Sequence, residues 1–440
     1  MQFQIEKLVY GGDGIARLPA DAKGRGKAVF VPFTLPNECV EARVVKSRSG
    51  FVRAQLERVV VASPERVEPA CEYFGRCGGC HYQHIDYAAQ VRFKRDVLRE
   101  TLRRTAKLEL EHEIRVHGSE PWGYRNRTRM RMQHEPKFGL GYHRYNSQEL
   151  FTVQHCPISS PLINRGIASI WSMGREGRVP KMLYGVQFFA NHDDTALLVE
   201  IYVHPSSSAK DCEGFASKLR TLVPAIGGVV AFVNPPVEDE PRQRDLALVE
   251  RPGAYDKFGS NRLMYDVAGH RYCVSGGSFF QTNRFLIDEL VHIVTRDCAG
   301  RTALDLYAGV GLFTLALAKS FEKVIAVEAS PHSFSDLRVN IPSNVRPIRA
   351  TAEKFLAEHA FKSGVDLVVV DPPRVGLGER TARVLGRMPV SRVTYVSCDP
   401  ATLSRDLRVL LECGFRVEQM HLIDLFPQTY HMEAVLQLVR

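Results

Sequence analysis

A cysteine stands at the end of an apolar, strand-like run in the C-terminal part of the chain. Cys398 closes the stretch TYVSC and is followed by Asp399 and Pro400, which do not continue a strand comfortably. Such a thiol either fills the rim of a core, as most free cysteines do, or presents a reactive group to a ligand. Its surroundings decide between these two possibilities.

Acidic residues lie at the ends of other predicted strands in the same part of the chain. Asp305, Glu328 and Asp371 each end or follow an apolar run. The carboxyl ends of parallel strands meet at one edge of a doubly wound sheet, so we expect these carboxylates near Cys398. If the final strand runs antiparallel, Glu433 at its beginning reaches the same edge.

A glycine turn after the first of these strands indicates a nucleotide-like cofactor. Gly309 and Gly311 let the chain turn tightly against a ligand, and Glu328 is placed to accept hydrogen bonds from two ribose hydroxyls. The turn lacks the third glycine of a pyrophosphate-binding loop. This pattern looks like a site for S-adenosylmethionine (SAM), which has no pyrophosphate.

A thiol, a carboxylate and a methyl donor together suit the methylation of a pyrimidine at C5. The Cys398 thiolate can add to C6 of uracil and turn the ring into an enolate whose C5 attacks the methyl sulfonium. Glu433 is then the candidate base for the C5 proton. At an ordinary pKa of ~8.5 few thiols are ionised at neutral pH, so we expect a local activating environment.

Four other cysteines have a spacing that suggests a metal centre. Cys71, Cys77 and Cys80 follow the pattern C-x5-C-x2-C on a glycine-rich loop, and Cys156 stands far from them, before Pro157. Zinc sites usually combine two short spacings, whereas a grouped trio with a distant Cys-Pro favours an iron–sulfur cluster. Zinc and plain packing remain the alternatives.

These motifs resemble those of the RNA uracil-5 methyltransferases over nearly the whole chain. SCDPATLSRDL is similar to the nucleophile motif of that family, HMEAV to the base motif, DPPR to the aspartate motif, and GGSFFQTN to the loop that contacts cofactor and target base. The resemblance implies that Cys398 attacks the uracil and that Glu433 deprotonates it. It also implies SAM contacts from Gln281, Tyr307, Glu328 and Asp371, and base stacking by Phe279. Asp399 stands where asparagine is common in the family.

The expected fold is a multidomain α/β protein of three parts. Residues 1–61 read as short strands between glycine and proline turns and predict a small OB-like β-barrel, which resembles the RNA-binding TRAM domain of the family. Residues 62–270 predict a mixed α+β domain whose helix near 85–107 packs on the catalytic domain. Residues 271–440 alternate strands and helices, as in a doubly wound, Rossmann-like SAM-dependent methyltransferase domain. In the resemblance, the ligands of a 4Fe-4S cluster are Cys71, Cys77, Cys80 and Cys156.

The charge of the chain favours a polyanionic partner. Lys and Arg number 58 against 49 Asp and Glu, which leaves a net charge of +9. In YRNRTRMRM, arginines recur at period two, so in a strand they would share one face and suit a row of phosphates. They are Arg125, Arg127, Arg129 and Arg131.

We therefore predict SAM-dependent C5 methylation of a uridine in RNA, with 23S rRNA as the expected substrate. A tRNA uracil-5-methyltransferase is the alternative, and an inactive RNA-binding or ribosome-assembly factor is an alternative of another class. A cytosine-5 enzyme would show a Pro-Cys nucleophile instead. No stretch approaches the ~18 uninterrupted apolar residues of a membrane helix, and we expect a cytoplasmic monomer.

Overall fold

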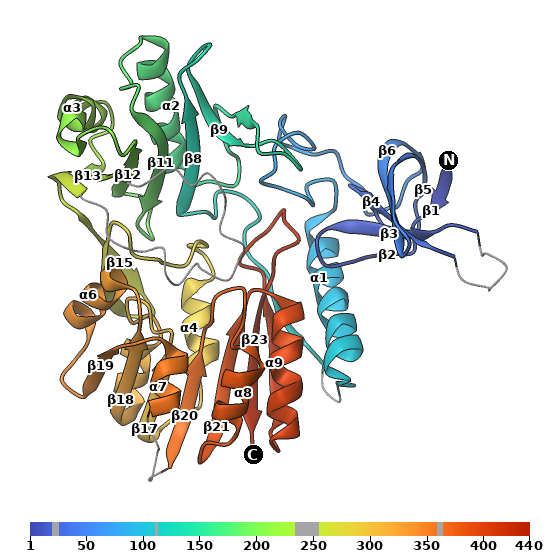
Figure 1. Ribbon diagram of the computed structural model, residues 1–440, viewed down its shortest axis with the longest axis vertical. Coiled ribbons are helices and arrows are strands. Elements are labelled where there is room, and N and C mark those ends of the chain that lie inside the picture. The colour runs from blue at the N-terminus through green and yellow to red at the C-terminus, as the bar shows by residue number, and fades with distance from the viewer. Residues whose placement is uncertain (20–25, 111–112, 234–254, 359–363) are drawn as a thin grey trace.

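The computed structural model describes residues 1–19, 26–110, 113–233, 255–358 and 364–440. Its described strands form three large sheets and one hairpin, β15 (Arg262–Val267) with β16 (His270–Ser275). Helix α1 (Tyr87–Thr101) lies between the N-terminal and C-terminal sheets (Figure 1).

The N-terminal sheet is strongly curled, so the predicted small β-barrel is present as a half-barrel (Figure 1). Its strand order is β1-β5-β6-β4-β3-β2, and β1 returns to contact β3. Alternating burial along the strands puts Val29, Val31, Val52 and Ala54 into its core. The strands are β1 (Gln2–Gln4), β2 (Lys7–Leu8), β3 (Asp13–Arg17), β4 (Ala28–Pro32), β5 (Cys39–Ser47) and β6 (Phe51–Val61).

The middle of the chain forms a mixed sheet in the order β10-β9-β8-β11-β12-β13-β14. Within the described residues its neighbouring strands are antiparallel except for the parallel pair β12 and β13. Helices α2 (Pro161–Arg175) and α3 (Glu213–Leu222) share one core with it. The strands are β8 (Arg127–Gln133), β9 (Gly139–His143), β10 (Leu150–Thr152), β11 (Leu183–Ala190), β12 (Leu197–Val203), β13 (Ile226–Val233) and β14 (Tyr255–Gly259).

The C-terminal sheet has the order β19-β18-β17-β20-β21-β23-β22-β7. The five strands β17 to β21 pair with one another in parallel. Strand β23 is antiparallel to both β21 and β22. The eighth strand, β7, comes from an earlier part of the chain and pairs with β22 at the edge. The strands are β7 (Arg115–His117), β17 (Gly300–Leu306), β18 (Phe321–Glu328), β19 (Val345–Arg349), β20 (Val365–Val370), β21 (Val390–Ser397), β22 (Arg416–Ile423) and β23 (Glu433–Val439).

Helices cover both faces of this sheet, which explains why its central strands are apolar throughout. Along β20, Val368 and Val370 belong to one core, whereas Leu367 and Val369 belong to the other. The first face carries α1 with α7 (Ala352–Glu358), α8 (Gly378–Gly386) and α9 (Pro400–Glu412). The second carries α4 (Ile287–Thr295), α5 (Thr314–Ser320) and α6 (Pro331–Asn340).

Helix α1 joins the core of the C-terminal sheet through residues that recur at helical spacing. Asp86 caps its N-terminus by accepting from two backbone N–H groups. Leu98 of α1, and Leu102 in the π-helical turn that follows it (Leu102–Ala106), are fully buried in one core with Leu403 and Leu407 of α9. None of the helices in the described parts of the chain has the length and apolar character that a membrane crossing requires.

Candidate active site

The carboxyl edge of the C-terminal sheet gathers the predicted catalytic residues. Strand β20 ends one residue before Asp371, and β21 ends at Ser397, one residue before Cys398. Strand β23 begins at Glu433 and runs antiparallel to β21, with Ser397 paired to Ala434. Continuing this register by one residue places Cys398 beside Glu433.

Cys398 is half-buried and lies close to acidic groups. Burial, and after it the neighbouring Glu433, raises the pKa of its thiol to about 12, and Asp371 acts in the same direction. The Arg374 guanidinium opposes them and lowers this pKa. In the free protein the thiol is therefore protonated at neutral pH, and nucleophilic attack requires a change in its electrostatic surroundings.

The two carboxyl groups beside the thiol share this environment. Glu433 is buried, and its burial raises its pKa well above the usual range, with Asp371 adding to the effect and Arg374 opposing it. Burial, with a contribution from Asp305, raises the pKa of Asp371 to about 7. Arg374 is thus a cation that acts on both the thiol and Glu433.

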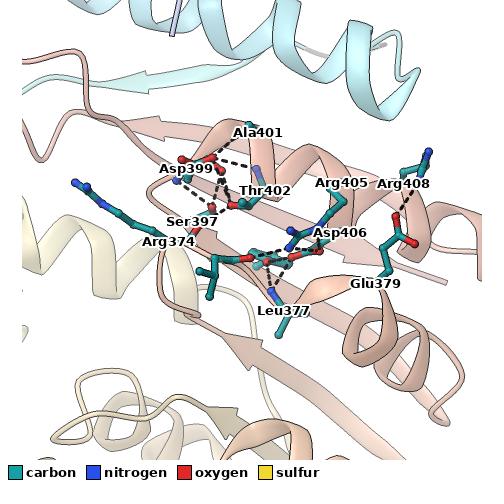
Figure 2. A network of polar contacts seen from close by, with 12 residues as sticks. Arg374, Leu377, Glu379, Ser397, Asp399, Ala401, Thr402, Arg405, Asp406 and Arg408 are labelled. Carbon is teal, nitrogen blue, oxygen red and sulfur yellow. Dashed lines mark hydrogen bonds and ion pairs between the residues drawn. The ribbon is translucent and has the colours of Figure 1, made fainter. Parts of the chain in front are cut away.

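The backbone around Cys398 is fixed by the first turn of α9 (Figure 2). Asp399 is the N-cap, and its Oδ1 accepts from two backbone N–H groups of that turn at 2.9 and 3.0 Å. Its own N–H donates to Ser397 Oγ at 3.2 Å. Thr402 Oγ1 donates to the Arg374 carbonyl at 3.0 Å and so joins the nucleophile loop to the DPPR loop. In Figure 2 the Arg374 side chain extends away from this network.

A buried carboxylate in α9 anchors the same region from below (Figure 2). Asp406 accepts from the Tyr395 hydroxyl at 2.8 Å and from the Leu377 N–H at 2.7 Å. Arg405 Nε donates to its other oxygen at 2.9 Å. Strand β21, helix α9 and the loop before α8 are therefore connected through one side chain.

The glycine turn after β17 is organised around Glu328. The Gly309 N–H, in the left-handed region at φ +57°, donates to Glu328 Oε2 at 2.8 Å. The Ser330 N–H donates to the other oxygen at 2.6 Å. Tyr307, which also has a positive φ of 62°, donates its hydroxyl to Glu353 at 2.7 Å. The turn that carries Tyr307 is therefore joined to Glu328 at the end of β18, so the two predicted cofactor contacts belong to neighbouring strand ends.

Asp305 offers a free acceptor at this turn. It is fully buried, and Thr314 Oγ1 donates to its Oδ2 at 2.5 Å. Its Oδ1 is buried and has no hydrogen-bond partner among the described residues. A buried acceptor without a partner is costly, so the position fits a ligand that brings an amine or hydroxyl donor, as SAM does.

The loop with the predicted base-stacking residue is held from the central sheet. Phe279 is 64% exposed, whereas Ser278 and Gln281 beside it are buried. The Arg127 guanidinium donates to the Ser278 carbonyl at 2.6 Å and to Glu200 at 3.1 Å. Glu200 also accepts a hydrogen bond of 3.2 Å from the Gly277 N–H of this loop. An exposed ring on a fixed loop suits stacking on an unpaired base.

The four predicted RNA-contacting arginines do not form one exposed row. Within β8, Arg127, Arg129 and Arg131 share a face, but Arg127 is buried while the other two are exposed. Arg129 lies over the Tyr202 ring at 4.3 Å. Arg125 precedes β8, and its Nε is buried. RNA contact by Arg129 and Arg131 stays a prediction, whereas Arg125 and Arg127 make interactions inside the protein.

The four spaced cysteines come together in the central part of the chain. Burial, with contributions from Cys156 and Cys71, raises the pKa of Cys77 to about 11. Cys80 is affected by the other three in the same way. Within the described ranges, however, no three Cys, His, Asp or Glu side chains are arranged closely enough to hold a metal ion.

Arg125 brings a positive charge to this group of thiols. It lies within electrostatic range of Cys80 and Cys156 and of Tyr142, whose side chain contacts Cys156. Its Nε has no hydrogen-bond partner among the described residues. A cation whose buried Nε has no partner fits an anionic group held by cysteines, and an iron–sulfur cluster ligated by four thiolates is such a group.

Some residues at the site gave little signal in the sequence. Arg374 stands inside the DPPR motif, but the motif alone did not indicate that it acts on the thiol. Thr314 is one turn beyond the glycines and buried against Asp305. Tyr10, in the N-terminal half-barrel, contacts the nucleophile loop, and no local pattern marks it.

Comparison with known proteins places this site in a family. A model described as tRNA (Uracil-5-)-methyltransferase matches residues 258–440, and a TRAM domain model matches residues 4–56. An uncharacterised RNA methyltransferase of Aquifex aeolicus is 32% identical and covers 99% of this chain and 97% of its own length. The 23S rRNA (uracil(1939)-C(5))-methyltransferase RlmD of Chromohalobacter salexigens is also 32% identical, with 99% and 88% covered. The chain belongs to the RNA uracil-5-methyltransferase family.

The family settles several predictions for this RNA uracil-5-methyltransferase. It is an enzyme, which confirms the prediction of catalysis over that of an inactive assembly factor. The solved Pyrococcus abyssi tRNA (uracil-54, C5)-methyltransferase, in complex with S-adenosyl-L-homocysteine, covers 100% of both chains at a TM-score of 0.77 and 24% identity, which confirms the fold. Membership of a methyltransferase family supports SAM as the methyl donor. The domain boundaries at residues 61 and 270, the cytoplasmic location and the monomeric state stay predictions.

Proposed function

We propose that this enzyme methylates C5 of a uridine in 23S rRNA through a covalent bond between Cys398 and C6, with Glu433 as the base. The observation that supports this most directly is the register of β21 and β23. It sets the thiol and the carboxyl side by side at the edge that also carries the glycine turn. Each remaining residue is assigned from its place around this pair.

The chemistry begins when the Cys398 thiol gives its proton to solvent and the thiolate adds to C6, which moves the electron pair of the C5–C6 double bond into the ring and makes C5 nucleophilic. SAM, when bound, supplies the electrophilic methyl group that C5 acquires. Glu433 then takes the proton from C5, and the electron pair of the C5–H bond re-forms the C5–C6 double bond. The C6–S bond breaks, and its electron pair leaves with the Cys398 thiolate. Arg374 lowers the pKa of both groups, which favours the Cys398 thiolate for the first step and the ionised Glu433 carboxylate for the last.

The cofactor is held along the same edge of the sheet, on the side of Cys398 that faces away from Glu433. Glu328 accepts the ribose hydroxyls, its two oxygens fixed by backbone N–H groups, and Asp305 offers its free oxygen nearby. The remaining contacts come from Gln281, Tyr307 and Asp371. A stacked base cannot reach Cys398, so the uridine leaves the RNA stack and packs on Phe279. Arg129 and Arg131 are exposed and hold phosphates.

The four cysteines, Cys71, Cys77, Cys80 and Cys156, hold a 4Fe-4S cluster, with Arg125 as a nearby positive charge. The spacing of the cysteines, three grouped on one glycine-rich loop and one distant before a proline, favours the cluster over a zinc ion, which usually takes two short spacings. Anaerobically purified protein should contain about four irons and four sulfides, and zinc in their place would contradict the assignment.

The relatives favour ribosomal RNA as the substrate. RlmD of Chromohalobacter salexigens and RlmD of Pseudomonas putida, which is 30% identical over 99% of this chain, are both named as 23S rRNA enzymes. Transfer RNA is the second candidate, because the matching family model and the Pyrococcus abyssi structure carry tRNA in their names. Mapping the methylated nucleotide in the RNA product identifies the target uridine.

The deciding experiment offers labelled SAM with unmodified 23S rRNA fragments and, in parallel, with tRNA transcripts. We expect 5-methyluridine at one position of the rRNA. Cys398→Ala should form no product, and Glu433→Gln should accumulate a protein–RNA adduct that migrates slowly in denaturing gels. Cys298→Ala and Glu322→Gln, which change the same residue types at the opposite edge of the sheet, are the controls and should stay active. Normal product formation by Cys398→Ala would contradict the covalent mechanism.

A further inference from the structure

A tyrosine of the TRAM domain reaches the catalytic cysteine loop. Tyr10 lies on the turn between β2 and β3, where Gly11 and Gly12 adopt positive φ angles of 106° and 91°. Its hydroxyl donates to Asp399 Oδ2 at 3.2 Å and makes a longer contact of 3.4 Å with the Cys398 carbonyl. The two partners are separated from Tyr10 by more than 380 residues of chain.

The position of the hydroxyl is determined by packing on the catalytic side. The Tyr10 ring meets Tyr430 edge to face, with centroids 5.5 Å apart. Gly12 allows this approach, because a Cβ at its position would lie 3.2 Å from the Tyr430 ring. Tyr430 itself lies three residues before Glu433. One tyrosine therefore contacts both segments that carry the catalytic pair.

The hydrogen bond between Tyr10 and Asp399 helps to fix the position of the Cys398 thiol. The two carboxylate oxygens of Asp399 have different partners: Oδ1 caps α9, and Oδ2 accepts from the Tyr10 hydroxyl. The peptide group that follows Cys398 is thus held on one side by the helix cap and on the other by a residue of a different domain. Burial and the nearby Asp399 raise the pKa of the Tyr10 hydroxyl, so it is protonated and able to donate at neutral pH.

We propose that Tyr10 is a positioning residue for the methyl transfer: the TRAM domain sets the backbone of Cys398 as well as binding RNA. This inference rests on the proposed role of Cys398. It predicts that loss of one hydroxyl in the TRAM domain slows the reaction at saturating RNA. If the TRAM domain acted through RNA binding alone, loss of this hydroxyl would change KM and leave kcat unaltered.

The test compares Tyr10→Phe, which keeps the ring, with the matched control Tyr145→Phe. The Tyr145 ring packs on Phe33 of the TRAM domain, and its hydroxyl contacts Asn146 away from the nucleophile loop. We expect Tyr10→Phe to lower kcat by about threefold to tenfold with KM within twofold, which is the effect of losing one ordinary hydrogen bond. The control should keep both constants within twofold.

A double-mutant cycle separates positioning from general structural support. Asp399→Asn keeps the helix cap through its Oδ1 and turns an NH₂ donor toward the Tyr10 hydroxyl, which reverses the hydrogen bond. Alone and combined with Tyr10→Phe it should be clearly non-additive, since the two changes alter the same contact. The rate of adduct formation with RNA that contains 5-fluorouridine should fall in parallel with kcat in Tyr10→Phe.

An unchanged kcat in Tyr10→Phe, a change in KM alone, or additive effects in the cycle would each overturn the inference. Cys398→Ala is measured alongside. If it stays active, the covalent mechanism fails; if it is inactive while Tyr10→Phe matches the wild type, the positioning role alone is wrong.

Discussion

Replacing Lys94 by methionine should lower the free energy of unfolding by about 3–5 kcal/mol, because it breaks a buried ion pair and leaves one partner behind. Lys94 Nζ lies 2.6 Å from Asp424 Oδ1, and both side chains are 0% exposed. The same Nζ donates to the Phe426 carbonyl at 3.0 Å. Methionine fills a volume similar to that of lysine, so no cavity forms. The loss of unfolding free energy therefore measures the cost of leaving the Asp424 carboxylate buried without its partner.

The pair is also important for catalysis, because Asp424 begins the loop that leads to Glu433. Other residues from the N-terminal half hold the same loop. Tyr124 donates its hydroxyl to the Pro427 carbonyl at 3.0 Å, and Gln90 and Gln428 exchange two hydrogen bonds of 3.0 Å. We therefore expect Lys94→Met to lower the rate of methyl transfer at temperatures at which the protein is still folded.

Urea unfolding followed by circular dichroism measures the stability, and labelled SAM measures the rate at 25 °C. The double variant Lys94→Met with Asp424→Leu removes both charges and should recover most of the lost stability. Arg92→Met is the matched control on the same helix, since Arg92 pairs with Glu65 at the surface and should cost at most about 1 kcal/mol. A loss below 1 kcal/mol for Lys94→Met, or a double variant less stable than the single, would refute the reasoning.

Further variants test the charges around the two sites. Arg374→Gln removes the cation that lowers the pKa of Cys398, so the pH profile of thiol alkylation should move to higher pH; an unmoved profile would contradict the assignment. Arg125→Met should lose iron during purification while Arg125→Lys retains more of it, measured as iron per protein; equal iron in all three proteins would remove its role beside the thiols. Changing Arg129 and Arg131 together to glutamine should weaken RNA binding and flatten its salt dependence, with a slope smaller by up to about two; an unchanged slope would exclude phosphate contact.

The edge of the catalytic sheet could be predicted from local patterns. Strands buried on both faces are continuous apolar runs, so the residues that end them, Asp371 and Cys398 among them, are visible in the sequence. Parallel pairing then brings these ends to one edge without further information. The antiparallel last strand, which places Glu433 there, depends on topology that is typical of such sheets.

Contacts between distant parts of the chain could not be predicted in this way. Lys94 lies in a strongly basic helix and reads as a solvent-exposed residue, yet it is fully buried against Asp424, 330 positions away. The period-two arginines illustrate a related limit, because alternation shows which side chains share a face but not whether that face is covered. Arg127 is covered by the Phe279 loop, whereas Arg129 is not.

The electrostatics of the free site predict that SAM itself prepares the thiol. Glu433 has a strongly raised pKa, Asp371 and Asp305 are raised to about 7, and Cys398 to about 12, each chiefly by burial. A cationic sulfonium at this edge favours the ionised form of every one of these acids and lowers its pKa.

Alkylation of Cys398 should therefore extend to lower pH when SAM is bound. S-adenosylhomocysteine occupies the same space without the positive charge and should give a smaller shift, which separates charge from steric protection. Mass spectrometry of the Cys398 peptide across a pH series measures both. Identical profiles with the two ligands would show that the thiol is activated by the protein and the RNA without help from the sulfonium charge.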